Sequence, residues 1–423
     1  MSIPLAHLCC PYFARFSAPW VPFFTKNVFF MSLQHRKIAL FVFLFAPGLA
    51  FSSWVTRTPA IRDAIGASIA QMGLVLTGLS VGSMCGVLLS GRVVQKRGTR
   101  FTMLLGLALA TAALLAMALG VVSGLQPAVA LGLCLFGLGM GLADVAINMD
   151  AALVERESGQ HIMHTLHGCF SLGTLVGALL GMGANALQVP VAWHLSAAFA
   201  VSAVLLWRFA RYVPAGYGML SSADDKAAHA PAGKPASVWR DARVLMIGFI
   251  VFAMALTEGS AYDWLPILLV DEYGFSAALG SMVFVVFAAM MTVGRFGGSV
   301  LLKRFGRLVV IRASITLAGV GVACIALGQG QVLAAVAVMC WGMGAALGFP
   351  VALSAVAEGG GQMNERIQAV ATIGYIALLV GPPALGFVGQ VLGLRGAMLV
   401  VLGFVAVAIG MTRAVRTPAA SPS

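Results

Sequence analysis

Two carboxylates inside long apolar segments are the residues of this chain best placed to do chemistry. Only 14 of the 423 residues are Asp or Glu. Glu258 lies roughly fourteen residues into the apolar segment 244–265, and Asp144 lies roughly sixteen residues into the segment 128–149. A charge inside a membrane costs about 2.5–3.5 kcal/mol on insertion scales, and such a residue usually faces a cavity or a partner. We therefore expect Glu258 and Asp144 to handle protons or charge, with a structural ion pair near the helix end as the alternative for Asp144.

Asn148 and Arg57 are the other side chains expected to meet a solute. Asn148 follows Asp144 by one helical turn, so both lie on the same helix face. Arg57 ends the first apolar segment, where its guanidinium can bind an anionic group or close a gate with Asp263 or Asp271. The alternative for Arg57 is an arginine that reaches to the membrane surface. Asp263 itself is expected to be a wetted helix end.

Three histidines stand at the start of the apolar segment 166–187, namely His161, His164 and His167. Their spacing spreads them around about 120° of a helix, so they do not converge as metal ligands do. We expect a structural or proton-relay role for His167. His164 or His167 is expected to pair across a short loop with one of three acids, Asp144, Asp150 or Glu155. No metal site and no cofactor is expected.

Two glycine motifs imitate enzyme signatures but fall inside apolar segments. The run Gly78–Gly82 has the spacing of a nucleophile elbow, which needs a strand–turn–helix corner. The run Gly137–Gly141 has the spacing of a dinucleotide-binding loop, which needs a preceding strand. Long apolar segments supply neither context, so we expect no enzymatic activity.

The composition identifies the elements that must position these residues. Hydrophobic residues make up 60% of the chain and charged residues only 9%, whereas a soluble domain carries about 25% charged residues. These values exclude a disordered chain, a coiled coil, a disulfide-rich secreted scaffold and an ordinary soluble enzyme. The chain is expected to be an all-α protein that crosses a membrane many times.

Twelve apolar segments have the length of a membrane-spanning helix, which is roughly 17–24 residues for a hydrocarbon core about 30 Å thick. They are 38–56, 73–91, 101–122, 128–149, 166–187, 191–211, 244–265, 277–297, 308–328, 332–353, 367–390 and 395–412.

The basic residues predict the orientation of these spans. Of the 26 Lys and Arg residues, only Arg57, Arg62 and Arg395 fall on the side opposite the chain ends, apart from two in the first thirty residues. Lysine and arginine accumulate in cytoplasmic loops, so both termini are expected in the cytoplasm of a bacterial-type cell. The net charge of +12 is then a topology signal, and no nucleic acid is expected as a partner.

A polar stretch divides the spans into two halves that repeat each other. Residues 213–243 are expected to form a cytoplasmic linker between a first six-helix bundle (31–212) and a second one (244–415), followed by a tail at 416–423. The basic run 91–100 follows the second span, and a similar run at 299–307 follows the eighth. Internal repeats of this kind are typical of secondary transporters.

Residues 1–30 do not fit this scheme. Pro4, Pro11, Pro19 and Pro22 interrupt their apolar stretch, and no signal-peptide pattern follows it. We treat 1–30 as an N-terminal extension and hypothesise that the native product begins at Met31.

The spans, their division and the basic loop resemble the major facilitator superfamily. The loop matches that family's pattern at Gly91, Lys96, Gly98 and Arg100, although Gln95 stands where an aspartate is usual. The second copy keeps Arg304, Gly306 and Arg307. The resemblance implies two six-helix bundles that rock around a central cavity, with these loops as a conformational gate. Without an acid at position 95, the basic residues of this gate must bind helix-end carbonyls or another acid. Arg295 is also expected to help hold the gate closed.

Several short motifs look like those of a bacterial subgroup of uncharacterised porters near the fucose permeases. Their residues include Trp54, Arg57, Asp144, Asn148, His167, Gly173, Glu258 and Asp263. In the fucose permeases a carboxylate on the first span takes part in proton coupling, and the first span here has none. Drug–proton antiporters of the superfamily usually have an arginine in span four and a Gly-Pro pair in span five. Spans four and five of this chain have neither, and a Gly-Pro pair occurs only in span eleven, at Gly381 and Pro382.

The expected fold is an all-α membrane protein of twelve transmembrane helices in two pseudo-symmetric bundles. The expected function is secondary active transport of a small solute across the inner membrane by alternating access, coupled to protons. The alternatives are an efflux antiporter for amphipathic compounds and a non-transporting membrane sensor. A small-molecule substrate, protons and membrane lipid are the expected partners of a monomer.

Overall fold

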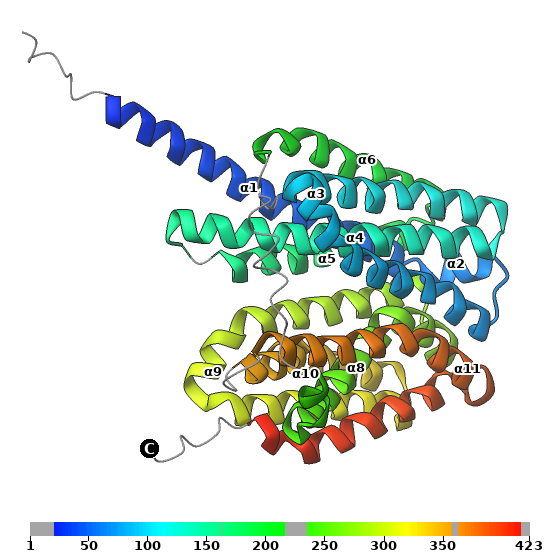
Figure 1. The fold of residues 1–423 in the computed structure, drawn as a ribbon. Helices are drawn as coiled ribbons and strands as arrows, with labels where there is room; N and C mark the ends of the chain where they lie inside the picture. The colour runs from blue at the N-terminus through cyan, green and yellow to red at the C-terminus, as the bar shows by residue number, and fades with distance from the viewer. Residues whose placement is uncertain (1–20, 161, 216–234, 358–362, 416–423) are drawn as a thin grey trace, which may run out of the picture.

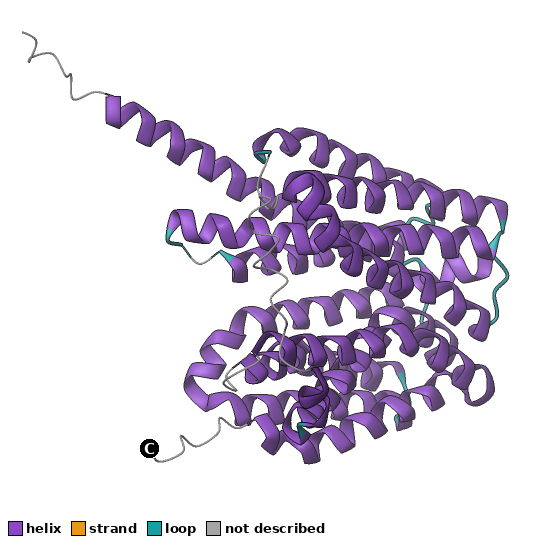
Figure 2. Ribbon diagram, in the orientation of Figure 1, coloured by secondary structure: helices purple, strands orange, loops and turns teal. Residues whose placement is uncertain are grey.

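A computed structural model describes residues 21–160, 162–215, 235–357 and 363–415. Every regular element within these ranges is a helix (Figure 2). The part of the proposed extension at residues 1–20, most of the expected linker and the expected tail at 416–423 lie outside them.

Helices α1 to α6 form the first bundle. Its elements are α1 (Val21–Val55), α2 (Thr58–Ala64), α3 (Ile69–Ser123), α4 (Gln126–Ser158), α5 (Met163–Ala186), α6 (Val191–Phe209) and the 3₁₀ turn η1 (Ala210–Tyr212). Helix α1 begins well before the predicted start of the first span at residue 38, and projects from the bundle at its N-terminal end (Figure 1).

Helices α8 to α11 form the second bundle. Its elements are the 3₁₀ turn η2 (Pro235–Arg240), α8 (Ala242–Tyr273), α9 (Ala277–Leu327), α10 (Gln331–Ala357), α11 (Met363–Met411) and η3 (Thr412–Val415). The two bundles lie beside each other in Figure 1.

Three of these helices are each long enough to cross a membrane twice. Helix α3 alone has 55 residues, about 80 Å at 1.5 Å per residue against a core of about 30 Å. Each is broken at one glycine with left-handed φ: Gly98 (82°) in α3, Gly306 (74°) in α9 and Gly393 (74°) in α11. Glycine adopts this conformation without a steric penalty. The nine spanning helices of the described ranges therefore supply twelve spans, which confirms the predicted fold.

The chain reversals define two ends of the molecule. The turns at Gly98 and Gly306, which lie within the two basic runs, are at what we call the linker end, together with η1 and η3. Helix α2 and the turn at Gly393 lie at the opposite end, which we call the α2 end (Figure 1).

Small residues bring helices of the same bundle into backbone contact. A Cβ atom added at Gly82 of α3 would collide with the carbonyl of Cys134 in α4, and one at Gly137 of α4 would collide with the carbonyl of Leu79. Membrane helices pack closely at such positions because lipid supplies no hydrophobic drive for their association.

Candidate functional site

An ion pair lies at the interface between the two bundles. Glu258 of α8 accepts a hydrogen bond of 2.7 Å through Oε1 from Nη2 of Arg295 in α9. Nη1 of the same guanidinium donates to the hydroxyl of Ser171, which belongs to α5 of the first bundle, at 3.2 Å. The side chains of Glu258 and Arg295 are 21% and 30% exposed. Arg295 therefore ties the second bundle to the first while it neutralises a carboxylate.

Packing inside the second bundle turns Glu258 toward this interface. The neighbouring Thr257 is fully buried, and its carbonyl accepts a hydrogen bond of 3.0 Å from the indole of Trp341 in α10. Successive residues of a helix point about 100° apart, so a Thr257 directed into its own bundle leaves Glu258 on another face. The contact from Arg295 to Ser171 shows that this face looks toward the first bundle.

The prediction that Arg295 helps hold the linker-end gate missed this pairing. Arg295 bonds to Glu258 instead, inside the interface. The sequence contains a pattern that predicts the pairing of Glu258 with Arg295, because α8 and α9 are antiparallel and joined by a short loop near Gly274. Residues at similar distances from such a loop lie at similar depths, and Glu258 and Arg295 satisfy this condition.

An aromatic group borders the ion pair. Tyr262, one turn after Glu258, packs edge-on against Phe51 of α1, with ring centroids 5.1 Å apart. On its other side it contacts Phe284 and Phe287 of α9, at 6.1 and 5.7 Å. The contact between Phe51 and Tyr262 joins the two bundles, and sequence reasoning did not single out either residue.

Asp144 lies in a second polar group that also involves both bundles. The side-chain amide of Asn148 donates to the Asp144 carboxylate at 3.0 Å and to its carbonyl at 2.9 Å. His167 of α5 and Tyr375 of α11 are close enough to Asp144 to interact with it electrostatically. Among the described residues Asp144 forms no ion pair with lysine or arginine. A pairing of His167 with Asp144 is one of those expected from the sequence.

The two polar groups adjoin the same face of α5. His167 and Ser171 are one turn apart, which is about 6 Å along the helix axis. The Ser171 hydroxyl also donates to the His167 carbonyl at 3.4 Å. One face of α5 therefore carries a neighbour of Asp144 and the partner of Arg295.

Arg57 is buried within the first bundle. Its Nη2 donates to the carbonyl of Val189, which precedes α6, and its charge acts on the nearby His194. Nε and Nη1 of Arg57 find no hydrogen-bond partner in the described part of the chain. Burial lowers the pKa of this guanidinium from its ordinary value.

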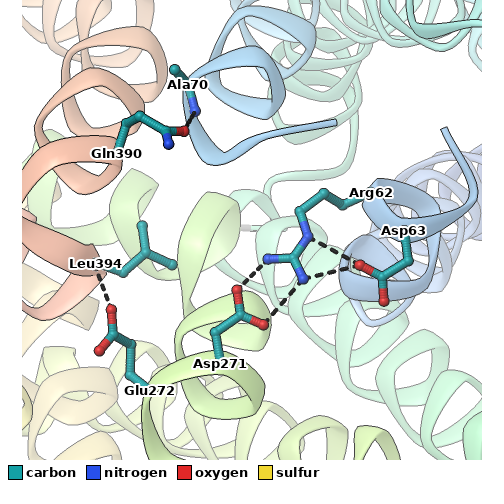
Figure 3. Close-up of polar contacts among 7 residues, drawn as sticks. All are labelled: Arg62, Asp63, Ala70, Asp271, Glu272, Gln390 and Leu394. Atoms are coloured by element: carbon teal, nitrogen blue, oxygen red, sulfur yellow. Dashed lines mark hydrogen bonds and ion pairs between the residues drawn. The ribbon is translucent and has the colours of Figure 1, made fainter. Parts of the chain in front are cut away.

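Arg62, not Arg57, bonds across the α2 end. Its guanidinium holds the carboxylate of Asp271 in α8 through both Nη atoms and also contacts Asp63 (Figure 3). The hydrogen bond to Asp271 raises the pKa of Arg62 above its ordinary value. Asp263 differs from the expected wetted helix end, because only 8% of it is exposed.

Further contacts close the α2 end between the bundles. The amide of Asn185 donates to the hydroxyl of Ser281 at 2.6 Å. The side chain of Gln390 in α11 accepts from the backbone of Ala70 in α3 at 3.2 Å (Figure 3). Together with Arg62 and Asp271 they join α2, α3 and α5 to α8, α9 and α11.

The predicted gate loops turn at the linker end. Gly98 and Gly306 make the turns, and the exposed side chains of Lys96 and Arg304 flank them. Thr99 donates to Asp150 at 3.4 Å, and Asp150 is held by Nε and Nη2 of Arg36 at 3.0 and 2.7 Å. Asp150 is thus an acid beside the first loop, where position 95 carries glutamine. The predicted set of gate residues also includes Gly91, Arg100 and Arg307.

Comparisons with known proteins agree with this architecture. The sequence model of the Major Facilitator Superfamily matches residues 38–375. An uncharacterised MFS-type transporter of Yersinia pestis is 31% identical over 355 residues, which cover 82% of this chain and 87% of that protein. The membrane protein MosC of Rhizobium meliloti is 27% identical over 368 residues, covering 85% and 84%.

Solved structures have the same fold. A variant of the nucleoside transporter NupG superposes with a TM-score of 0.72 at 17% identity, covering 90% of this chain and 99% of that one. The fucose:proton symporter FucP of Escherichia coli gives a TM-score of 0.62 at 16% identity, covering 89% and 97%. From the matched family model, the relatives and the two bundles of six spans, the chain belongs to the Major Facilitator Superfamily of membrane transporters.

Proposed function

We propose that this transporter moves a small solute across a bacterial inner membrane by alternating access, driven by protons. The observation that carries the proposal is Arg295, which is bonded at once to Glu258 and to Ser171 of the opposite bundle. A change in the charge of Glu258 therefore alters the contact between Arg295 and Ser171, which joins the two bundles that move relative to each other during transport.

Protonation of Glu258 is the proposed coupling step. A proton on its carboxyl group removes the negative charge that holds Arg295 in the charge-assisted hydrogen bond. The released guanidinium can then bind an acceptor on the solute or reposition against Ser171, so the relative stability of the two bundle arrangements changes. A proton alters a conformational equilibrium only to the extent that it binds the two arrangements with different affinity.

Asp144 and His167 are proposed as a second proton site, with Asn148 as a polar contact for the solute. These residues adjoin the face of α5 that carries Ser171. We assign the gate at the α2 end to Arg62 and Asp271, and retain Arg57 as a contact for an anionic group because of its unpartnered nitrogens.

The contacts at the α2 end support a conformation closed on that side. With both termini in the cytoplasm, as the distribution of basic residues predicts, the α2 end faces the periplasm. The closed α2 end then corresponds to a state in which solute cannot pass between the interface of the two bundles and the periplasm.

The test begins with thermal-shift measurements against sugars, organic acids and drugs, followed by transport of the best ligand in proteoliposomes. We expect an imposed proton gradient to drive accumulation, and Glu258→Gln to keep ligand binding but lose the response to the gradient. Asp63→Asn is the control, because this carboxylate is 68% exposed at the α2 end. Uptake that is equally fast with and without the gradient would refute proton coupling.

The aromatic contact between the bundles favours efflux of an amphipathic compound as the second candidate. Phe51 and Tyr262, with Phe284 and Phe287 beside them, offer an apolar surface next to the ion pair. In the same proteoliposomes, exchange of an amphipathic substrate against protons in the opposite direction distinguishes efflux from uptake. A sensor that transports nothing predicts no flux for any ligand that binds.

A further inference from the structure

We propose that Arg208, Arg211, Tyr212 and His35 form a binding site for the phosphate group of an anionic phospholipid. These residues lie at the linker end of the first bundle, where α6 runs into η1 beside α1. They are remote from Glu258 in the chain and take no part in the contacts described above.

Two guanidinium groups converge on one phenol oxygen. Nη1 of Arg208 and Nη2 of Arg211 donate to Oη of Tyr212 at 2.7 and 3.0 Å. Both guanidinium carbons also lie over the tyrosine ring, 5.4 and 4.9 Å from its centroid. The imidazole of His35 also stacks on this ring, with centroids 4.9 Å apart and the ring planes nearly parallel. The cluster is therefore built from α1, α6 and η1.

This cluster has an excess of positive charge. Within the described part of the chain, no carboxylate forms an ion pair with Arg208 or Arg211, whereas the neighbouring Arg36 is paired with Asp150 and Glu157. Two cations held on one neutral oxygen repel each other, and an anion between them removes that repulsion. A phosphate group offers both the charge and the oxygen acceptors that match two guanidinium forks.

The position of the cluster identifies a lipid as the source of the phosphate. Trp207, one residue before Arg208, is 80% exposed, and only 28% of the most apolar stretch of its span is buried. Tryptophan and tyrosine next to arginine mark the level of the lipid headgroups. A phospholipid bound there lays its acyl chains along the exposed face of α6. A choline headgroup adds a fixed positive charge close to the arginines, so an anionic headgroup is preferred.

Native mass spectrometry of the detergent-purified protein, titrated with phosphatidylglycerol or phosphatidylcholine, tests the site. We expect phosphatidylglycerol to bind more tightly, and Arg208→Gln/Arg211→Gln to weaken its binding about tenfold, which is roughly threefold for each of the two exposed charge-assisted contacts that are lost. The matched control is Arg92→Gln/Arg97→Gln, which removes the same charge from two exposed residues at the same end. It should leave phosphatidylglycerol binding unchanged.

A more conservative variant distinguishes the loss of lipid binding from a folding defect. Tyr212→Phe keeps the ring that stacks on His35 but removes the oxygen that gathers the arginines, and we expect a loss of affinity of a few-fold. Three results would overturn the proposal: equal binding of the two lipids, equal loss in both double variants, or full competition by inorganic phosphate at the lipid concentration. The last would identify a site for a free anion. None of these measurements depends on whether Glu258 couples protons to transport.

Discussion

The guanidinium of Arg62 holds the carboxylate of Asp271, and this pair joins the first bundle to the second at the α2 end. The two residues are 15% and 28% exposed, so water screens their attraction only in part. Around them, Asn185 with Ser281 and Ala70 with Gln390 complete the closure. Opening of this end must break all of these contacts together.

Arg62→Gln should therefore favour opening of the α2 end. Loss of the pair is expected to destabilise the closed arrangement relative to the open one by about 1 kcal/mol, which raises the ratio of open to closed molecules roughly fivefold. The measurement is the rate at which maleimide labels a Ser281→Cys variant in nanodiscs, with the Ser281 parent as background. Ser281 is only 2% exposed in the closed arrangement. Arg92→Gln, which removes the charge of an exposed residue at the linker end, should not change the rate, and an unchanged rate in Arg62→Gln would show that the pair does not hold the gate.

A double-mutant cycle should detect coupling between Glu258 and Arg295. Glu258→Gln leaves the partly buried guanidinium without its anion, and we expect a loss of about 1.5–3 kcal/mol of stability, as for a hydrogen bond to a charged group. Arg295→Gln should cost a similar amount, and the double variant should cost less than the sum. Thermal unfolding in one detergent supplies the three values. Additive losses would mean that the 2.7 Å contact contributes nothing to stability.

The sequence predicts the fold well because the bilayer imposes one length on every span. The twelve apolar segments and the two halves follow from that length and from the basic loops. What it does not show is that α3 and α9 continue through Gly98 and Gly306 with a single left-handed residue in place of an open loop. A positive φ is a property of one backbone position, and several other glycines in these segments remain helical.

The site is predicted less completely, because the pattern of residues gives the face of a helix but not its partner. Glu258 and Asp144 are recognisable as rare intramembrane acids, whereas the position of Arg295 near a span end predicts only a role in the gate. The long arginine side chain reaches from there to Glu258. The expectation of a wetted helix end at Asp263 is wrong because helix α8 continues to Tyr273 and keeps that position inside the bundle.

The buried network of Arg36 and Asp150 should be the most sensitive electrostatic feature of the first bundle. Asp150→Asn removes the closer of the two carboxylates that form salt bridges with the buried Arg36 in the described part of the chain, Asp150 at 2.7 Å and Glu157 at 3.2 Å, and removal of one partner of a buried pair costs about 3–5 kcal/mol. Arg36→Met/Asp150→Leu removes both charges and should be less damaging than Asp150→Asn alone. Thermal unfolding of the three proteins compares them. A double variant as unstable as the single one would show that the charges are not the cause.

Gly306 and Gly91 allow the left-handed turns to be tested with a matched pair of substitutions. A Cβ atom added at either glycine meets nothing within 4 Å, but Gly306 has φ of 74° and Gly91 lies inside helical backbone. Gly306→Ala should therefore lose about 1–3 kcal/mol, because the backbone at 306 combines φ of 74° with ψ of 163°, a region that is essentially restricted to glycine. Gly91→Ala should gain about 0.5–1 kcal/mol, since alanine loses less entropy in a helix than glycine does. Chemical or thermal unfolding of both variants shows directly whether each substitution raises or lowers the stability of the protein. If both substitutions stabilise the protein, α9 does not need a left-handed residue at 306, and the break between its two spans has another cause.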